Sequence, residues 1–171
     1  MRISKIDYYL DIAMVVSSRS TCLRRKYGAV IVKNDQLIST GFNGSPRGAV
    51  NCCDIGMCRK NIHNIPHGVG YTEFCESTHA EQNAIIHASR QEMLESTLYI
   101  AGTDYETGEE LLSPEPCSIC MRMIINAGID QIITRKLSVF SSESNHFSDM
   151  YNVIKLTDVV HGMKNSRAEK D

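Results

Sequence analysis

The sequence predicts an α/β layered fold within a single domain, and three observations carry this prediction. The chain has 171 residues, which is enough to bury one well-formed core. Its composition is that of an ordinary soluble protein, with 42% hydrophobic and 22% charged residues. Strand patterns alternate with helix patterns along the chain. We therefore expect one domain over residues 1–171, with a frayed polar tail at 165–171.

A helix and a β-hairpin are expected first. Apolar residues recur at helical spacing from about Ser4 to Ser18, and Ser4 fits the N-cap position. Two β-rich runs follow at 28–32 and 36–41, and the Asn34-Asp35 pair between them indicates a hairpin turn.

A long stretch without periodicity separates this hairpin from the next helix. Residues 45–77 hold many Gly, Cys and His residues and little repeating pattern. Loops of this length are uncommon in compact domains unless they are functional, disordered or tied down. The Cys and His content makes a metal staple one interpretation of the segment.

The second half predicts two helices and three strands. One helix begins at about Thr78, and another follows Pro116 and ends at Gly128, which suits a left-handed helix cap. The β-rich runs at 98–101, 131–134 and 153–156 are the strand candidates.

Composition and charge favour a small-molecule partner over nucleic acid or membrane. The formal net charge is -2, Trp is absent and aromatic residues make up 6%, so neither a basic footprint nor a large base-stacking platform is expected. No apolar run approaches the roughly 20 residues that span a bilayer, and no secretion signal is evident. We expect a cytoplasmic protein whose seven Cys residues are metal ligands and reduced thiols rather than disulfides.

Two short motifs, each at an expected helix start, carry the chemistry. They are His79-Ala80-Glu81 and residues 116–120 (PCSIC). A Cys-x-x-Cys pair at a helix start turns both sulfurs toward one side of the first turn, where the helix dipole favours thiolates. An imidazole from a second helix completes three protein ligands and leaves the fourth position of a tetrahedral zinc open for water, as in catalytic sites. We predict that His79, Cys117 and Cys120 hold this zinc.

Glu81 is predicted to carry protons. Two thiolates offset the charge of the ion and leave the water less acidic than a three-histidine site would, so a nearby base is needed. Glu81 can take the proton of this water during attack on an amidine-like carbon, and then deliver it to the ring nitrogen and the leaving ammonia. Alone, Thr78 to Glu81 also fits a capping box, and Cys117 with Cys120 fits half a structural zinc site or a redox pair. Both motifs together favour the catalytic interpretation.

Around these motifs, the sequence resembles the cytidine and deoxycytidylate deaminase superfamily, most closely its deoxycytidylate (dCMP) deaminases. The resemblance spans roughly residues 4–135 and includes Cys22, Cys52, Cys75 and the runs 24–32 (RRKYGAVIV), 39–48 (STGFNGSPRG), 79–85 (HAEQNAI) and 123–129 (MIINAGI). It implies a three-layer α/β/α sandwich of the cytidine-deaminase type with a central mixed sheet. It also implies hydrolysis of dCMP to dUMP and ammonia.

The resemblance assigns further roles to the glycine-rich segment. Asn43 would meet the sugar of the substrate, while Phe42 stands where relatives have Tyr, so that a hydroxyl contact is lost. Gly41, Phe42, Asn43 and Gly44 would lie near a site for the effectors dCTP and dTTP in a homo-oligomer, a hexamer in many relatives. A tight turn between strand and loop is the alternative.

Four basic residues are candidates for the phosphate of a nucleotide: Arg24, Arg25, Lys26 and Arg47. A guanidinium binds phosphate oxygens in a bidentate manner, and Arg47 on the glycine-rich loop is the leading candidate. Each of the four, taken singly, also fits a solvated surface charge.

Some relatives carry a second, structural zinc. The matching residues here are Cys22, Cys52 and Cys75, with His67 or His63 as fourth ligand. Such a site would order the long loop, and three buried reduced thiols are the alternative. Cys53 and Cys58 receive no role.

One departure from the family pattern leaves the substrate open. Residues 102–110 (GTDYETGEE) form a longer linker than relatives have and are expected to make an acidic turn over the entrance to the site. Alternative substrates are a free nucleoside, a riboflavin-pathway pyrimidine and tRNA adenosine, the last disfavoured by the net charge. A catalytically silent nucleotide sensor and a zinc-stapled interaction module are the alternatives outside the enzyme class.

Overall fold

The computed structural model describes residues 2–136 and 147–168 and has a five-stranded sheet at its centre. The strands run in the order β2-β1-β3-β4-β5 across the sheet. Only the β3–β4 pair is parallel among these strands, so the sheet is mixed as expected. The strand bounds are β1 (Arg25–Lys33), β2 (Gln36–Phe42), β3 (Thr97–Asp104), β4 (Gln131–Arg135) and β5 (Tyr151–Lys155).

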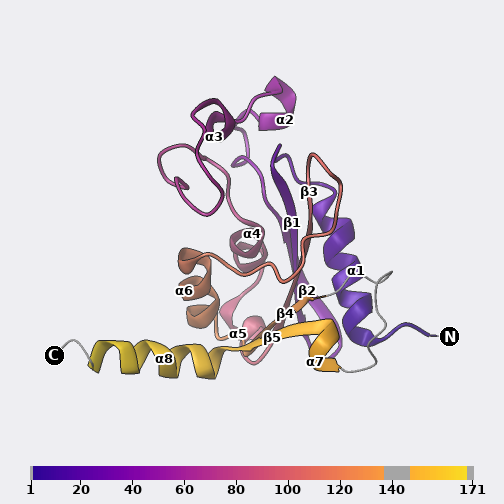
Figure 1. Ribbon diagram of the computed structural model, residues 1–171. Helices are drawn as coiled ribbons and strands as arrows, with labels where there is room; N and C mark the ends of the chain where they lie inside the picture. The colour runs from indigo at the N-terminus through magenta and orange to yellow at the C-terminus, as the bar shows by residue number, and fades with distance from the viewer. Residues whose placement is uncertain (1, 137–146, 169–171) are drawn as a thin grey trace.

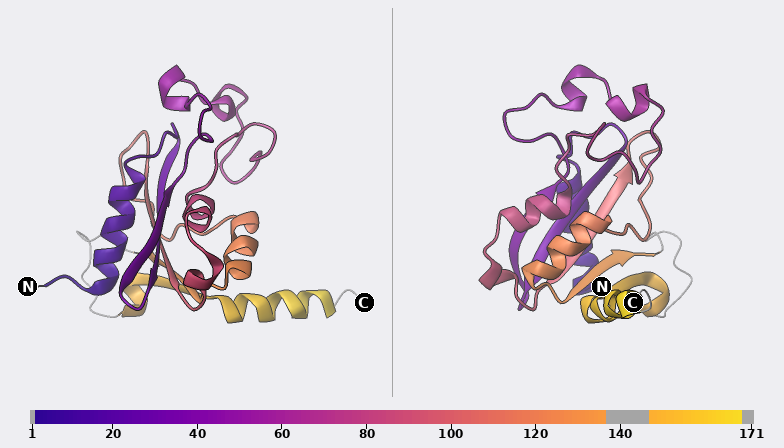
Figure 2. Two further views of the ribbon diagram at one scale, coloured as in Figure 1. Left: turned by 180° about the vertical axis from the view of Figure 1, so that it is seen from behind. Right: turned by 90° about the vertical axis from the view of Figure 1, so that its left-hand side faces the viewer.

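Helices cover both faces of the sheet (Figure 1). The helix α1 (Lys5–Ser17) packs on one face, and Ser4 caps it by accepting a hydrogen bond from the Asp7 backbone N–H, as its position predicted. On the other face lie α4 (Ala80–Ile86), α5 (Arg90–Met93) and α6 (Ser118–Ala127). The two further views show the resulting α/β/α layers from behind and from the side (Figure 2).

The central strand β1 explains why the sheet is covered on both sides. Its residues 28–32 are all buried, and successive side chains of a strand point to opposite faces. Val30 and Val32 pack into the core under α1, whereas Ala29 and Ile31 pack into the core under α4 and α6. The hairpin turn to β2 is the predicted one, because Asn34 and Asp35 both adopt positive φ angles, of 50° and 61°.

Two features fix the helices that carry the motifs. The parallel strands β3 and β4 need a crossover connection, and α6 supplies it, ending at Gly128 with φ of 83°. The strand β2 touches α4 directly: a Cβ at Gly41 would collide with the backbone of Ala80 and Ala84. Glycine at position 41 therefore lets the first turn of α4 lie against the sheet.

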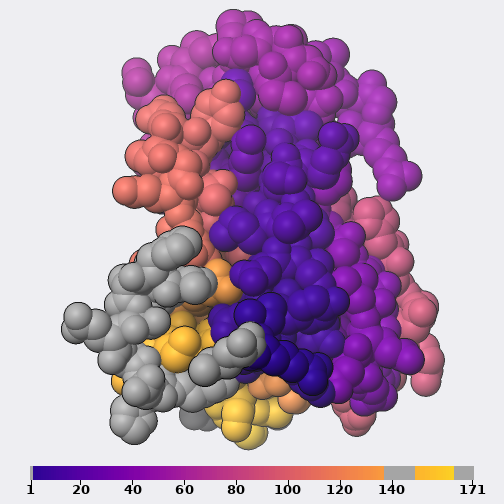
Figure 3. All heavy atoms as spheres, turned by 90° about the vertical axis from the view of Figure 1, so that its right-hand side faces the viewer, coloured from indigo at the N-terminus to yellow at the C-terminus, as the bar shows by residue number. Residues whose placement is uncertain are grey.

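The segment 43–79 crosses the end of the sheet and holds two short helices, α2 (Cys52–Ile55) and α3 (Arg59–Ile62). In the space-filling view it forms a cap above α1 and the neighbouring strands (Figure 3). Its two ends pair with each other through the backbone of Gly44 and Thr78, and its middle is anchored at Ile65, whose carbonyl accepts a 2.9 Å hydrogen bond from Arg24.

The C-terminal part adds α7 (Phe147–Met150), the edge strand β5 and α8 (Leu156–Ala168). The helix α8 runs along the end of the molecule away from α1 (Figures 1 and 2). Helical backbone continues to Ala168, into the stretch expected to fray, and residues 169–171 lie outside the described residues. Over the described helices, none is both long and apolar enough to cross a membrane.

Candidate metal centre

The first turns of α4 and α6 bring three metal-ligand side chains together. The Nδ1 atom of His79 lies 3.3 Å from the Sγ atom of Cys120 and 3.6 Å from that of Cys117. Zinc bonds of about 2.0 Å to nitrogen and 2.3 Å to sulfur, at a tetrahedral angle, separate two such ligand atoms by about 3.5 Å. Both nitrogen–sulfur separations match this value, and all three ligand atoms lie within 4.8 Å of one another, so the residues fit one zinc ion.

The local sequence explains why these side chains converge. His79 and Cys117 are the N-cap residues of their helices, and Cys117 Sγ accepts a hydrogen bond from the Cys120 backbone N–H. Such donors and the helix dipole stabilise a thiolate. Gln82 closes the start of α4, because its Oε1 accepts a 2.8 Å hydrogen bond from the His79 N–H. The capping-box alternative for Glu81 is thus not realised.

Burial sets the protonation chemistry of the site. The pKa of His79 is lowered by burial, which favours the neutral imidazole that ligates metals. Burial also raises the pKa of the Cys120 thiol, so binding of an ion there releases a proton. Glu81 is 8% exposed, and burial raises the pKa of its carboxyl group above the ordinary range. A carboxyl group with a raised pKa beside a metal site is suited to carrying protons.

Two of the three ligands and Glu81 open onto a cavity of about 560 Å³, whose walls come from distant parts of the chain. His79, Glu81 and Cys117 line it, as do the end of β1, the segment 43–77 and the linker before α6. Pockets for small ligands span about 300–1,000 Å³, so a nucleotide-sized molecule fits.

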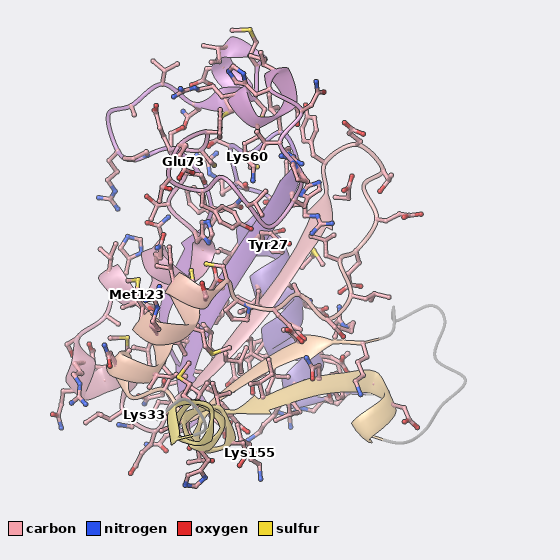
Figure 4. All side chains as sticks on the ribbon, turned by 60° about the vertical axis from the view of Figure 1, so that its left-hand side comes forward. Tyr27, Lys33, Lys60, Glu73, Met123 and Lys155 are labelled. Atoms are coloured by element: carbon pink, nitrogen blue, oxygen red, sulfur yellow. The ribbon has the colours of Figure 1, made fainter. Side chains whose placement is uncertain are left out.

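One wall of this cavity is basic. It is lined by Arg24, Arg25, Lys60 and His67. Lys60 is only 5% exposed, and its Nζ atom lies 4.5 Å from the ring centroid of Tyr71. The Tyr71 ring in turn meets the ring of His79 edge-on, with centroids 4.9 Å apart. Lys60 lies on the side of the segment 43–79 that faces Tyr27, near the first residues of β1 (Figure 4).

The electrostatics of this wall favour an anion. The pKa of Lys60 is lowered mainly by burial and secondly by the charge of Arg24. The pKa of His67 is also lowered mainly by burial. The positive charges of Arg25, Arg24 and Lys60 lower it further. Lys60 forms no ion pair with a carboxylate of the described chain. Sequence analysis missed Lys60, because nothing in the sequence distinguishes it from a surface lysine.

The other phosphate candidates lie elsewhere. Lys26 packs over the ring of Tyr105 at 5.3 Å, and Arg47 is exposed beside His87, with Nη2 3.3 Å from Nε2 of the imidazole. Neither lines the cavity. A phosphate contact by Arg47 therefore stays a prediction without support from its position.

Asn43 lines the cavity, but its side chain is engaged in holding the local backbone. Its Oδ1 accepts hydrogen bonds from the Ser20 hydroxyl at 2.7 Å and the Tyr27 N–H at 2.8 Å. Its Nδ2 donates to the Arg25 carbonyl at 2.9 Å. The sugar contact of Asn43 stays a prediction, as does the effector role of residues 41–44.

The remaining cysteines gather near this wall. The thiol of Cys52 interacts electrostatically first with Cys58 and then with Cys22 and Cys75, and burial raises its pKa. His67 interacts instead with the basic residues and Asp104, and the ring of His63 packs 5.2 Å from that of Phe74. Cys53 is exposed beside Asp54. Across the described side chains, only His79, Cys117 and Cys120 form a trio whose ligand atoms lie within 4.8 Å of one another.

Comparison with known proteins decides the family. A model of the cytidine and deoxycytidylate deaminase zinc-binding region matches residues 3–136. The chain belongs to this family. Within it, the chain is 34% identical over 137 residues to the deoxycytidylate deaminase of Mycobacterium phage D29, covering 77% of this chain and 94% of that protein. It is 32% identical over 157 residues to that of Enterobacteria phage T4, covering 75% and 76%.

Some relatives of this deaminase family are much longer. The Saccharomyces cerevisiae deoxycytidylate deaminase is 30% identical over 139 residues, which cover 78% of this chain and 38% of that protein. Among solved structures, the dCMP deaminase of cyanophage S-TIM5 in complex with dCMP and dUMP aligns with a TM-score of 0.51 and 27% identity, covering 77% of this chain and 81% of that one. A cytidine deaminase from Burkholderia pseudomallei aligns with a TM-score of 0.55 at 12% identity over 91% and 95% of the two chains, which supports the fold alone.

Family membership agrees with the metal site that the two motifs predicted. The protein is a zinc-dependent deaminase family member whose candidate zinc ligands are His79, Cys117 and Cys120. The expected three-layer fold with a mixed sheet is confirmed.

Proposed function

We propose that this protein hydrolyses dCMP to dUMP and ammonia. The observation that carries the proposal is the buried carboxyl group of Glu81 beside three converging zinc ligands, in a cavity with a basic wall. Similarity to dCMP deaminases of phages supports the choice of substrate. The cyanophage relative was solved in complex with dCMP and dUMP.

The roles of the residues follow from their positions. His79, Cys117 and Cys120 would hold zinc, which when bound supplies the Lewis acid that activates a water molecule. Glu81 accepts a proton from this water as its oxygen bonds to C4 of the cytosine ring, and passes the proton to N3. The C4–N bond then breaks, and Glu81 transfers the second water proton to the departing amino group, which leaves as ammonia.

The basic wall supports a nucleotide rather than a nucleoside. A nearby negative charge stabilises a buried ammonium group, and a bound phosphate would supply such a charge to Lys60 in addition to the neighbouring cysteines. Arg24 and Arg25 line the same wall, and a guanidinium suits phosphate oxygens. The 5′-phosphate of dCMP would therefore lie against this wall while its base meets Glu81.

Ammonia release from dCMP, CMP and deoxycytidine, measured side by side, tests the proposal. We expect dCMP to have the highest kcat/KM. Equal kcat/KM values for dCMP and deoxycytidine would contradict recognition of the phosphate. A higher kcat/KM for CMP would contradict a preference for the deoxyribonucleotide.

We also propose a second, structural zinc within the segment 43–79. Cys22, Cys52 and Cys75 remain its proposed ligands, and the neighbourhood of Cys52 supports Cys58 as the fourth in place of His67 or His63. Four thiols that close on one ion would order a segment with little apolar core of its own.

A further inference from the structure

A buried arginine joins three elements at the end of β4. The side chain of Arg135 is 5% exposed, and its Nη1 atom donates a hydrogen bond to Glu110 Oε1 at 2.8 Å. Its Nη2 atom donates to Asp11 Oδ1 at 3.1 Å and lies 3.4 Å from Asp7 Oδ1. The hydroxyl group of Tyr151 on β5 donates to the other Asp7 oxygen at 2.8 Å. One guanidinium thus donates to carboxylates on both sides of it, because its N–H groups point in different directions.

These carboxylates belong to different parts of the molecule. Asp7 and Asp11 lie on α1, at the face of the sheet opposite the metal centre. Glu110 lies on the linker 105–117, which connects β3 with α6 and ends at the zinc ligand Cys117. The guanidinium therefore couples this linker to the rigid sheet and to α1.

Arg135 holds the linker at a second point through its backbone. Its carbonyl oxygen accepts a hydrogen bond from the Ser113 N–H at 2.7 Å, and the Leu111 N–H donates to the Gly102 carbonyl at 2.8 Å. Directly after Glu110, the residues 111–115 line the catalytic cavity. The wall of the cavity is thus fixed from behind by contacts that no substrate would touch.

These partners stabilise the charged guanidinium of Arg135. Burial alone disfavours the charged guanidinium, but hydrogen bonding and charge from Glu110, and then from Asp11, outweigh it and raise the pKa of Arg135. A buried arginine that loses a carboxylate is left with an uncompensated charge, so loss of the Glu110 contact is unfavourable.

We propose that Glu110 and Arg135 form a positioning pair that sets the 111–115 wall and thereby the fit of the substrate. Neither residue touches the reacting atoms; the pair acts through the linker. The part of this inference that concerns substrate fit rests on the proposed function. The residues 111–115 line the cavity but carry no group assigned to proton transfer, so removal of the pair should appear in KM rather than in kcat.

The chain offers a matched comparison of Glu110→Ala with Asp11→Ala. Each removes one carboxylate from the same guanidinium, at 2.8 and 3.1 Å, but only Glu110 lies on the linker. We expect Glu110→Ala to raise the KM for dCMP about tenfold, equivalent to about 1.4 kcal/mol, with kcat within about twofold and zinc retained. Asp11→Ala should leave KM unchanged. Glu110→Gln keeps an acceptor oxygen for Arg135 and should restore most of the affinity.

Hydrogen exchange gives a readout that needs no substrate. The amide protons of Leu111 and Ser113 should exchange faster in Glu110→Ala and at the original rate in Asp11→Ala. Equal KM changes in the two variants, unchanged KM and exchange in Glu110→Ala, or loss of zinc from Glu110→Gln would each overturn the inference. A wild-type protein inactive on dCMP would contradict the proposed function, and amide exchange would still decide whether the pair holds the wall.

Discussion

Glu81 combines burial with a position beside the candidate metal ligands, and we propose that it carries the protons of the reaction. We expect Glu81→Gln to lower kcat about 10²–10⁴-fold, because an amide of the same shape cannot carry the proton. Steady-state ammonia release measures the loss, and the zinc content should not change. Glu76→Gln is the control, since Glu76 is exposed and pairs with Arg59. Retention of wild-type turnover in Glu81→Gln would end the assigned mechanism.

Lys60 is the residue at which the substrate phosphate should be recognised. We expect Lys60→Met to raise the KM for dCMP at least about tenfold and to leave that for deoxycytidine unchanged, because a charge-assisted contact to the phosphate is lost. Kinetics with both substrates measure the difference. Lys26→Met removes a nearby positive charge that does not line the cavity and serves as control. Equal losses with both substrates would assign Lys60 a structural role instead.

At the residue scale, the sequence predicted the convergence of the three candidate zinc ligands, and the role of Glu81 stays a prediction. His79, Glu81, Cys117 and Cys120 lie in two local motifs whose spacing on a helix start already determines how they face. Lys60 and Arg135 could not be found in this way, since their burial depends on packing between distant segments. Asn43 was assigned to the substrate by resemblance, and its observed hydrogen bonds to backbone and Ser20 had no signal in the sequence.

The packing of α4 on β2 determines where two of the site residues lie. We expect Gly41→Ala to destabilise the protein by about 1–3 kcal/mol, because its Cβ would collide with the backbone of Ala80 and Ala84. Chemical denaturation measures the change, and zinc affinity should fall with it. Gly162→Ala is the matched control: a Cβ there meets nothing within 4 Å, so stability should be equal or higher. Wild-type stability of Gly41→Ala would show that α4 can shift without loss.

Among the elements, those with strong periodicity or clear end signals were predicted. The first helix, the hairpin, the strand at 98–101, the helix after Pro116 and its Gly128 cap all appear in the structure. The helices α2, α3, α5 and α7 have four residues each, and such short helices depend on tertiary contacts rather than on a pattern. The helix α8 is mostly polar and was not predicted.

The acidic linker was expected to form a turn near the entrance, and the structure gives this turn an anchor. Asp104 accepts hydrogen bonds from the backbone N–H groups of Glu106 and Thr107, and Thr103 pairs with Glu110 across the turn. The sequence showed the turn residues, but the partner of Glu110 lies on β4 and could not be inferred.

For the molecule as a whole, zinc should contribute to stability as well as to activity. The ligands join α4 to α6, so removal by a chelator should abolish turnover and lower the thermal midpoint. Metal analysis of the purified protein should give close to two zinc ions per chain, and Cys58→Ser should reduce this to close to one while activity persists. One ion per chain in the wild-type protein would remove the second site. The hexamer implied by family resemblance stays a prediction that light scattering can test.

The strand order has a consequence for how the protein acquires its site. The strand β1 lies between β2 and β3, and β3 pairs in parallel with β4, so the cavity combines residues from the first fifth of the chain with others past its middle. Contacts between such remote positions close large loops, and proteins rich in them fold slowly. Both cysteine ligands follow β3 in the chain, so a ribosome-bound nascent chain lacks them until most of the sheet has been synthesised. Metal capture should accordingly be a late event in biosynthesis, and the growing polypeptide must reach that stage without the ion's help.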